Sequence, residues 1–65
     1  MQILLNGETF PTDAKTLDEL CALLGFADAK IATAVNGNFV AAVERVVTPL
    51  APADEIEIVA PRQGG

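Results

Sequence analysis

Two Asn-Gly pairs, Asn6-Gly7 and Asn36-Gly37, constrain the fold of this chain more than any other feature. Asn and Gly accept the positive φ angles of the type I′ turn, whose twist matches that of the two strands it joins. Each pair separates two short runs with strand character: Gln2–Leu5 and Glu8–Pro11 around the first, 31–35 and Asn38–Val40 around the second. We therefore predict two β-hairpins, and expect the second return strand to continue irregularly towards residues 46–47.

One helix is expected between the hairpins, over residues 16–24. Thr16 and Glu19 fit a capping box, in which the Thr16 hydroxyl accepts a hydrogen bond from an early backbone N–H and the Glu19 carboxylate accepts one from the N–H of Thr16. Apolar side chains then recur at helical spacing: Leu17, Leu20, Cys21 and Leu24. Gly25 follows where a helix end favours a left-handed residue, and Phe26 can fold back on the apolar stripe.

A last strand is predicted at residues 54–59, after a turn that contains two prolines. Glutamate and isoleucine alternate in it, so Ile56 and Ile58 should face the core while Glu55 and Glu57 face solvent. This strand completes a short list of elements: hairpin, helix, hairpin and final strand.

These elements predict a single domain of the α+β class. A chain of 65 residues has no room for a second domain, and one amphipathic helix can cover one face of a mixed sheet of four or five strands. A last strand that runs through the middle of the sheet and then releases a tail describes the β-grasp, or ubiquitin-like, architecture. Pro61 has no N–H for a ladder, so we expect a β-grasp domain over residues 1–61 and a flexible tail over 62–65.

Charge and composition exclude several classes of function. The net charge is −5 with four Lys and Arg residues, too few cations to neutralise nucleic acid or an anionic membrane. No His and one Cys leave no metal site and no internal disulfide. We expect a cytoplasmic protein, because no apolar run approaches the roughly 20 residues of a membrane span and the N-terminus lacks the basic region of a signal peptide. We also expect it to be monomeric when free. A core this small favours a binding or carrier role over a self-contained enzyme.

The last four residues carry the strongest functional signal: Arg62, Gln63, Gly64 and Gly65. Glycine makes up about 7% of average proteins, so a terminal Gly-Gly arises by chance in roughly 0.5% of chains. A glycine tail can enter a slot too narrow for other residues, and four extended residues reach about 14 Å. We predict that Gly65 carries its α-carboxylate into a partner's active site, and that the three residues before it contact that partner.

Other candidate sites are weaker. Cys21 stands in the apolar stripe of the helix, which favours core packing, where a thiol is inert. Three carboxylates lie in or beside the last strand and are expected on a solvated face, with a docking surface as the lesser alternative and catalysis nearly excluded: Asp54, Glu55 and Glu57. Alternation predicts that Leu4 and Val59 point away from the helix and form a small exposed apolar patch of the kind that marks interaction sites.

Four stretches of the chain match one known pattern: residues 1–8, 16–24, 34–40 and, with most weight, 56–65. Through them the whole chain resembles the ThiS family, the bacterial sulfur carriers of thiamine biosynthesis. It departs from that family at two places. Ala53-Asp54 stands where members often have Gly-Asp, and residues 41–44 lack the Pro-Arg and aromatic pattern often found there.

The resemblance implies a mechanism in which partners supply the catalysis and the chain needs no cofactor of its own. An E1-like adenylating enzyme would use ATP to convert the Gly65 carboxylate into an acyl adenylate. A sulfur donor, a cysteine desulfurase or similar, would convert that into a thiocarboxylate, and thiazole synthase would take the sulfur for the thiazole ring. An ionised carboxylate, with a pKa of about 3.3–3.7, is unreactive until one oxygen becomes a leaving group.

Three alternatives share the fold. A molybdopterin-synthase sulfur carrier has the same Gly-Gly end but a longer chain. A ubiquitin-like modifier would be joined to lysines of other proteins through Gly65. A plain β-grasp interaction module would keep its function without the tail.

Overall fold

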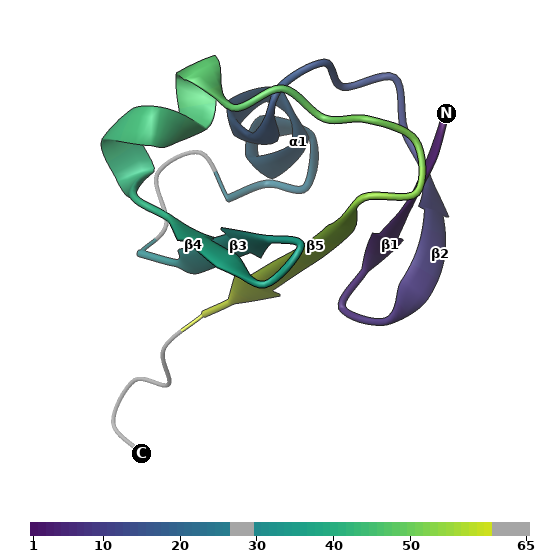
Figure 1. The fold of residues 1–65 in the computed structure, drawn as a ribbon. Helices are drawn as coiled ribbons and strands as arrows, with labels where there is room; N and C mark the ends of the chain where they lie inside the picture. The colour runs from purple at the N-terminus through teal and green to yellow at the C-terminus, as the bar shows by residue number, and fades with distance from the viewer. Residues whose placement is uncertain (27–29, 61–65) are drawn as a thin grey trace.

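The computed structural model describes residues 1–26 and 30–60, so predictions that fall on residues 27–29 and 61–65 lie outside it. In chain order its elements are β1 (Gln2–Leu5), β2 (Glu8–Pro11), α1 (Leu17–Leu23), β3 (Ala32–Val35), β4 (Asn38–Val40), the 3-10 helix η1 (Ala42–Val47) and β5 (Glu55–Val59). Both helices lie over the same face of one sheet, so the molecule has two layers (Figure 1).

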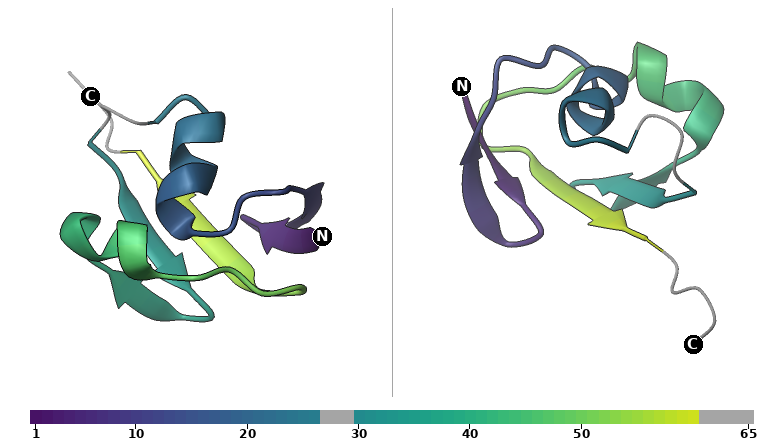
Figure 2. Two further views of the ribbon diagram at one scale, coloured as in Figure 1. Left: turned by 90° about the horizontal axis from the view of Figure 1, so that it is seen from above. Right: turned by 180° about the vertical axis from the view of Figure 1, so that it is seen from behind.

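The sheet has the order β2-β1-β5-β3-β4. The last strand in sequence is therefore the central strand in space, as Figure 2 also shows. β5 pairs in parallel with β1 and antiparallel with β3, and each hairpin adds an outer strand. This mixed sheet under one main helix confirms the predicted α+β, β-grasp arrangement.

Both predicted turns are present. Asn6 and Gly7 have φ angles of 50° and 86°, and Asn36 and Gly37 have 51° and 84°. Positive φ at both central residues is the type I′ signature. The register follows from these tight turns, since Leu5 pairs with Glu8 in one hairpin and Val35 with Asn38 in the other.

The start of α1 matches half of the predicted capping box. Thr16 is the N-cap, and its hydroxyl accepts a hydrogen bond of 3.2 Å from the N–H of Glu19. The predicted return bond from Glu19 to Thr16 is wrong, because the Glu19 carboxylate accepts from the N–H of Lys15 instead, at 2.9 Å. Backbone hydrogen bonds tie residues 15–17 to residues 48–50 and so fix the direction in which the chain enters the helix.

The helix ends as the glycine predicts. Gly25 has a φ of 86°. Its N–H donates to the carbonyl of Ala22 at 3.1 Å, and the N–H of Phe26 donates to the carbonyl of Cys21 at 2.8 Å. These two bonds form a Schellman motif. Phe26 then packs against the core, as expected.

The core lies between α1 and the covered face of the sheet. Its buried apolar residues are Ile3, Ala14, Leu17, Leu20, Cys21, Val40, Ile56 and Ile58. This set confirms the alternation of the last strand and three residues of the predicted helical stripe, while the fourth, Leu24, is partly buried and packs against the core. Full burial of a Leu or Ile side chain contributes about 1.5–3 kcal/mol, so a handful of residues on α1, β1 and β5 supplies most of the stability.

The segment after β4 differs from the prediction. It does not continue as an irregular strand but forms η1, which buries none of its residues. The Arg45 guanidinium explains the difference, because it turns inward and donates to the carbonyl of Ile31 at 2.7 Å and to the hydroxyl of Thr33 at 3.0 Å. That anchor to β3 leaves the valines of η1 facing outward.

Candidate functional site

The predicted site residues Arg62, Gln63, Gly64 and Gly65 lie outside the described residues, so the structure is informative about the platform that precedes them. The described chain ends at Ala60, directly after β5. β5 ends on the far side of the molecule from Met1 (Figure 1). Because β5 is the central strand, the sequence that follows it is attached to the best-supported element of the sheet.

The uncovered face of the sheet carries apolar and acidic side chains together. Strand register places Ala34 beside both Phe39 and Glu57, and Val59 beside Ala32. Phe39 and Val59 are 72% and 62% exposed, and Glu55 is exposed as well. The predicted exposure of Val59 is confirmed. Leu4, also predicted to be exposed, is half-buried instead.

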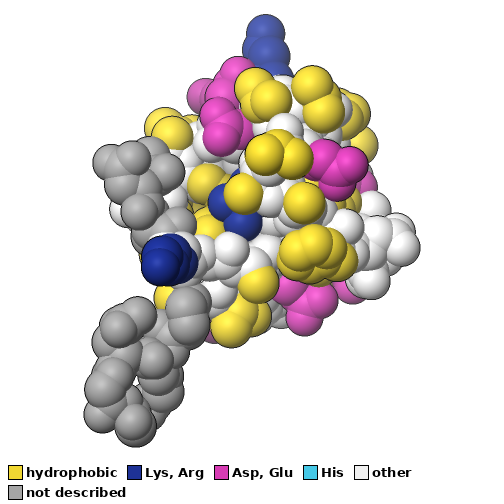
Figure 3. Space-filling model, turned by 90° about the vertical axis from the view of Figure 1, so that its left-hand side faces the viewer, with side chains coloured by type: hydrophobic (Ala, Val, Ile, Leu, Met, Phe, Trp, Pro, Cys, Tyr) yellow, Lys and Arg dark blue, Asp and Glu magenta, His cyan; other side chains and the backbone are white. Residues whose placement is uncertain are grey.

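Phe39 is a surface residue that the sequence prediction missed. β4 is three residues long, so alternation within it is too short to assign a face without the register of the partner strand. Figure 3 views the side of the molecule on which η1 lies and shows hydrophobic side chains spread over it, with acidic side chains between them. The exposed large hydrophobic residues of β4 and η1 are Phe39, Val43, Val46 and Val47.

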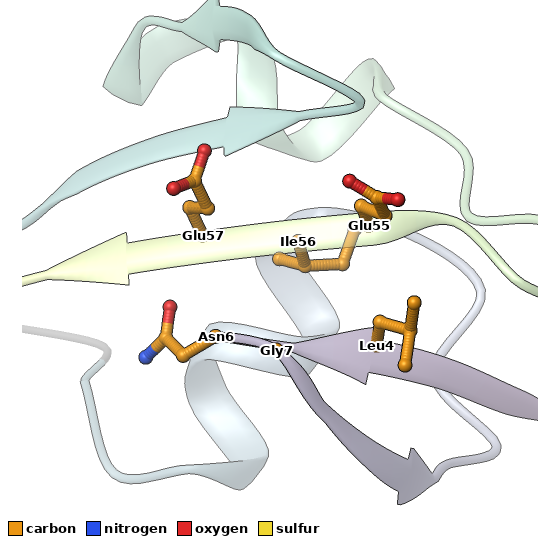
Figure 4. Close-up of a pocket in the computed structure, with 6 residues that line it drawn as sticks. All are labelled: Leu4, Asn6, Gly7, Glu55, Ile56 and Glu57. Atoms are coloured by element: carbon orange, nitrogen blue, oxygen red, sulfur yellow. The ribbon is translucent and has the colours of Figure 1, made fainter.

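A shallow pocket of about 410 Å³ lies where β1 and β5 meet. The six residues that line it are Leu4, Asn6, Gly7, Glu55, Ile56 and Glu57 (Figure 4). Two of its six lining residues carry carboxylates and none is basic. This pocket therefore suits a cationic group of a partner better than the phosphates of a nucleotide.

The three predicted acidic residues separate into two roles. Glu55 and Glu57 are exposed on the uncovered face, as expected. Asp54 is half-buried and has a structural role, because one carboxylate oxygen accepts from the N–H of Ala51 at 2.8 Å and the other from the side-chain amide of Asn36 at 3.1 Å. Asp54 closes the turn before β5.

Cys21 is a core residue, as predicted. It is 3% exposed and belongs to the same buried cluster as Leu17 and Leu20 of α1. Burial raises the pKa of the Cys21 thiol above its ordinary value of 9.0, although the Arg45 guanidinium acts in the opposite direction. A buried, protonated thiol is a poor nucleophile.

Within residues 1–26 and 30–60, no cluster of three or more His, Cys, Asp or Glu side chains could hold a metal ion. In this part of the chain, none of the helices has both the length and the apolar character that a membrane span needs. The described residues thus form a sheet with helices over one face and the other face uncovered.

Comparison with protein-family models identifies the family of this chain. The model of the ThiS family matches residues 3–65, which includes the Gly-Gly end. The chain belongs to the ThiS family.

The ThiS assignment agrees with the fold. A crystal structure of the thiamine biosynthesis protein ThiS from Geobacter metallireducens superposes with a TM-score of 0.83 at 23% sequence identity, and the match covers 100% of both chains. No curated protein matches the sequence. The β-grasp fold and the family resemblance predicted from sequence are therefore both confirmed.

Proposed function

We propose that this ThiS-family chain is a cytoplasmic sulfur carrier for thiazole formation in thiamine biosynthesis. Its Gly65 carboxylate is adenylated by an E1-like enzyme, converted to a thiocarboxylate with sulfur from a donor such as a cysteine desulfurase, and presented to thiazole synthase. The observation that carries the proposal is the match of the ThiS model through residue 65, on a domain whose central strand precedes the tail.

The chemistry of the domain supports a carrier acted on by enzymes. The thiol of Cys21 is buried and protonated, and the carboxylates of the β1–β5 pocket would repel the phosphates of ATP. ATP binding, adenylation and sulfur transfer are therefore assigned to the partners. The carrier contributes the carboxylate and its presentation.

The uncovered sheet face is the proposed docking surface for these enzymes. Exposed Phe39 and Val59 offer apolar area, and Glu55 and Glu57 add negative charge beside it. An interface of this kind fits a partner with an apolar centre and basic residues around it. The face and the tail would then be engaged together.

The test is ATP–pyrophosphate exchange with the adenylating enzyme of the same organism. The full chain should support exchange, and a chain without Gly65 should support none, because adenylation needs the terminal carboxylate in place. Equal exchange by both chains would contradict the proposal.

Thiazole synthase supplies the second arm of that experiment. Sulfur should pass from the loaded carrier to the product only when thiazole synthase is present. Attachment of the carrier to lysines of other proteins, seen as a ladder of heavier species on denaturing gels, would instead assign the chain to the protein modifiers.

A further inference from the structure

The two turn asparagines do more than permit positive φ, since both bond to β5. The Asn6 side-chain oxygen accepts from the N–H of Ile58 at 2.9 Å, and its amide nitrogen donates to the carbonyl of Ile58 at 3.2 Å. On the other flank of β5, the Asn36 side-chain oxygen accepts from the N–H of Glu55 at 2.9 Å. The two hairpin turns thus hold opposite ends of the central strand.

Beyond the end of β1, hydrogen bonds of the Asn6 side chain replace the backbone hydrogen bonds of the parallel ladder. The parallel ladder between β1 and β5 ends at Leu5 and Ile56, and the N–H of Asn6 still reaches the carbonyl of Ile56 at 2.9 Å. Backbone groups two residues apart point to the same side of a strand, so the N–H and C=O of Ile58 face the β1 side beyond the end of that ladder. The Asn6 amide supplies both an acceptor and a donor to them, and Figure 4 shows it beside the distal half of β5.

The two hydrogen bonds between the Asn6 side chain and Ile58, called the Asn6 bridge below, lie close to the end of β5 from which the tail continues. Ile58 is two residues before Ala60, the last described residue, and the sequence that follows is the Gly-Gly tail. On the opposite flank, β3 pairs with β5 as far as Val59. Without the Asn6 side chain, the end of β5 would be held from the β3 side alone, and strand ends with few hydrogen bonds open most readily.

We propose that Asn6 is a positioning residue, whose side-chain amide fixes the end of β5 and so the point from which the tail is presented. This role rests on the proposed carrier function. It acts through the backbone of Ile58 and requires no contact between Asn6 and the reacting carboxylate. A tail presented from a frayed strand samples more orientations, and a misplacement of about 1 Å at a reacting centre can slow a reaction on the order of a hundredfold.

The experiment compares Asn6→Gly with Asn36→Gly as a matched pair. The two positions have nearly the same φ, 50° and 51°, so glycine preserves both turns and removes only the side-chain amide. Hydrogen exchange should quicken about tenfold at the Ile58 amide in Asn6→Gly, the loss of one hydrogen bond, and at the Glu55 amide in Asn36→Gly. Pyrophosphate exchange, measured well below both melting temperatures, should show a kcat about tenfold lower for Asn6→Gly with little change in KM, and a wild-type kcat for Asn36→Gly.

Each result bears on a distinct claim. Unchanged exchange at the Ile58 amide in Asn6→Gly would overturn the bridge itself. Equal kcat values for the two variants would overturn the positioning role while leaving the carrier function intact. A wild-type carrier that supports no pyrophosphate exchange would overturn the proposed function, and the positioning role with it.

Discussion

Asn6, Asn36 and Ala53 are the non-glycine residues with positive φ in residues 1–26 and 30–60. Asparagine tolerates this conformation, but the Cβ of alanine approaches the following carbonyl oxygen, which costs roughly 1–2 kcal/mol. Ala53 is held at a φ of 69° while its N–H donates to the carbonyl of Gln2 at 2.8 Å. The departure from the Gly-Asp pattern of the family thus falls on a backbone position that favours glycine.

Ala53→Gly should therefore stabilise the protein. Relief of the strain exceeds the added entropy of the unfolded chain, with a net gain of about 0.5 kcal/mol and a melting temperature higher by a few degrees. Ala51→Gly is the matched control, because Ala51 is exposed in the same turn and has no positive φ; it should lower the melting temperature. A decrease for both variants would contradict the strain at Ala53.

Cys21→Ala should leave sulfur transfer intact and cost about 1 kcal/mol of stability, as a small core truncation. It should also remove a pH dependence. Because burial raises the pKa of the folded thiol above that of the unfolded chain, its contribution to stability is fully present below the ordinary thiol pKa and is lost as the pH rises through the pKa of the folded thiol. Melting curves from pH 7 to 10 check this, and loss of transfer by a folded Cys21→Ala carrier would overturn the core assignment.

At the scale of elements, the helix, the strands and the turns that local sequence signals encode could be predicted from the sequence. Asn-Gly turns, the Thr16 cap, the Gly25 end and the alternation of Ile and Glu each act over a few residues, and the elements they predict are present. One failure is local, the Glu19 carboxylate that accepts from Lys15 rather than from Thr16. The other failures involve partners distant in sequence: Arg45 with Thr33, Asp54 with Asn36, and Asn6 with Ile58. None of these pairs leaves a periodic pattern, so the sheet order has to be known before they can be inferred.

The same limit applies to the candidate site. The Gly-Gly end is visible in the sequence, whereas the exposed face of β4 and β5 depends on strand register. The exposure of Phe39 follows from the pairing of β4 with β3, and the structural role of Asp54 follows from its hydrogen bonds in the turn before β5.

Glu55→Lys with Glu57→Lys should slow association with the adenylating enzyme about tenfold at low salt, because surface charges act chiefly on encounter rates. High salt should diminish the difference. The control Asp18→Lys with Glu44→Lys makes the same change of net charge on α1 and η1, over the covered face of the sheet. Equal association rates for the two double variants at low salt would exclude the uncovered face as the docking surface.

For the whole molecule, we expect the residues that determine stability and the residues that determine function to lie in different parts of the chain. Every core residue in the described structure lies between Ile3 and Ile58, and the proposed chemistry takes place at Gly65. Leu20→Ala, inside the core, should cost about 2–5 kcal/mol and lower both melting temperature and carrier activity.

Gly64→Val should show the opposite pattern, with a melting curve close to that of the wild type and adenylation reduced on the order of a hundredfold. The branched Cβ of valine restricts the backbone and would clash in a slot shaped for glycine. Pyrophosphate exchange beside a melting curve measures both properties. Full exchange activity from this variant would mean that the tail does not enter a narrow site.

Intact mass spectrometry of the carrier purified from its native host, grown without added thiamine, tests the central claim most directly. We expect a species heavier than the carboxylate form by the difference between one sulfur and one oxygen atom, with fragmentation that locates the change at Gly65 and no such species in a chain without Gly65. A carrier that keeps the carboxylate mass throughout, or that carries the added sulfur on Cys21, would contradict the account.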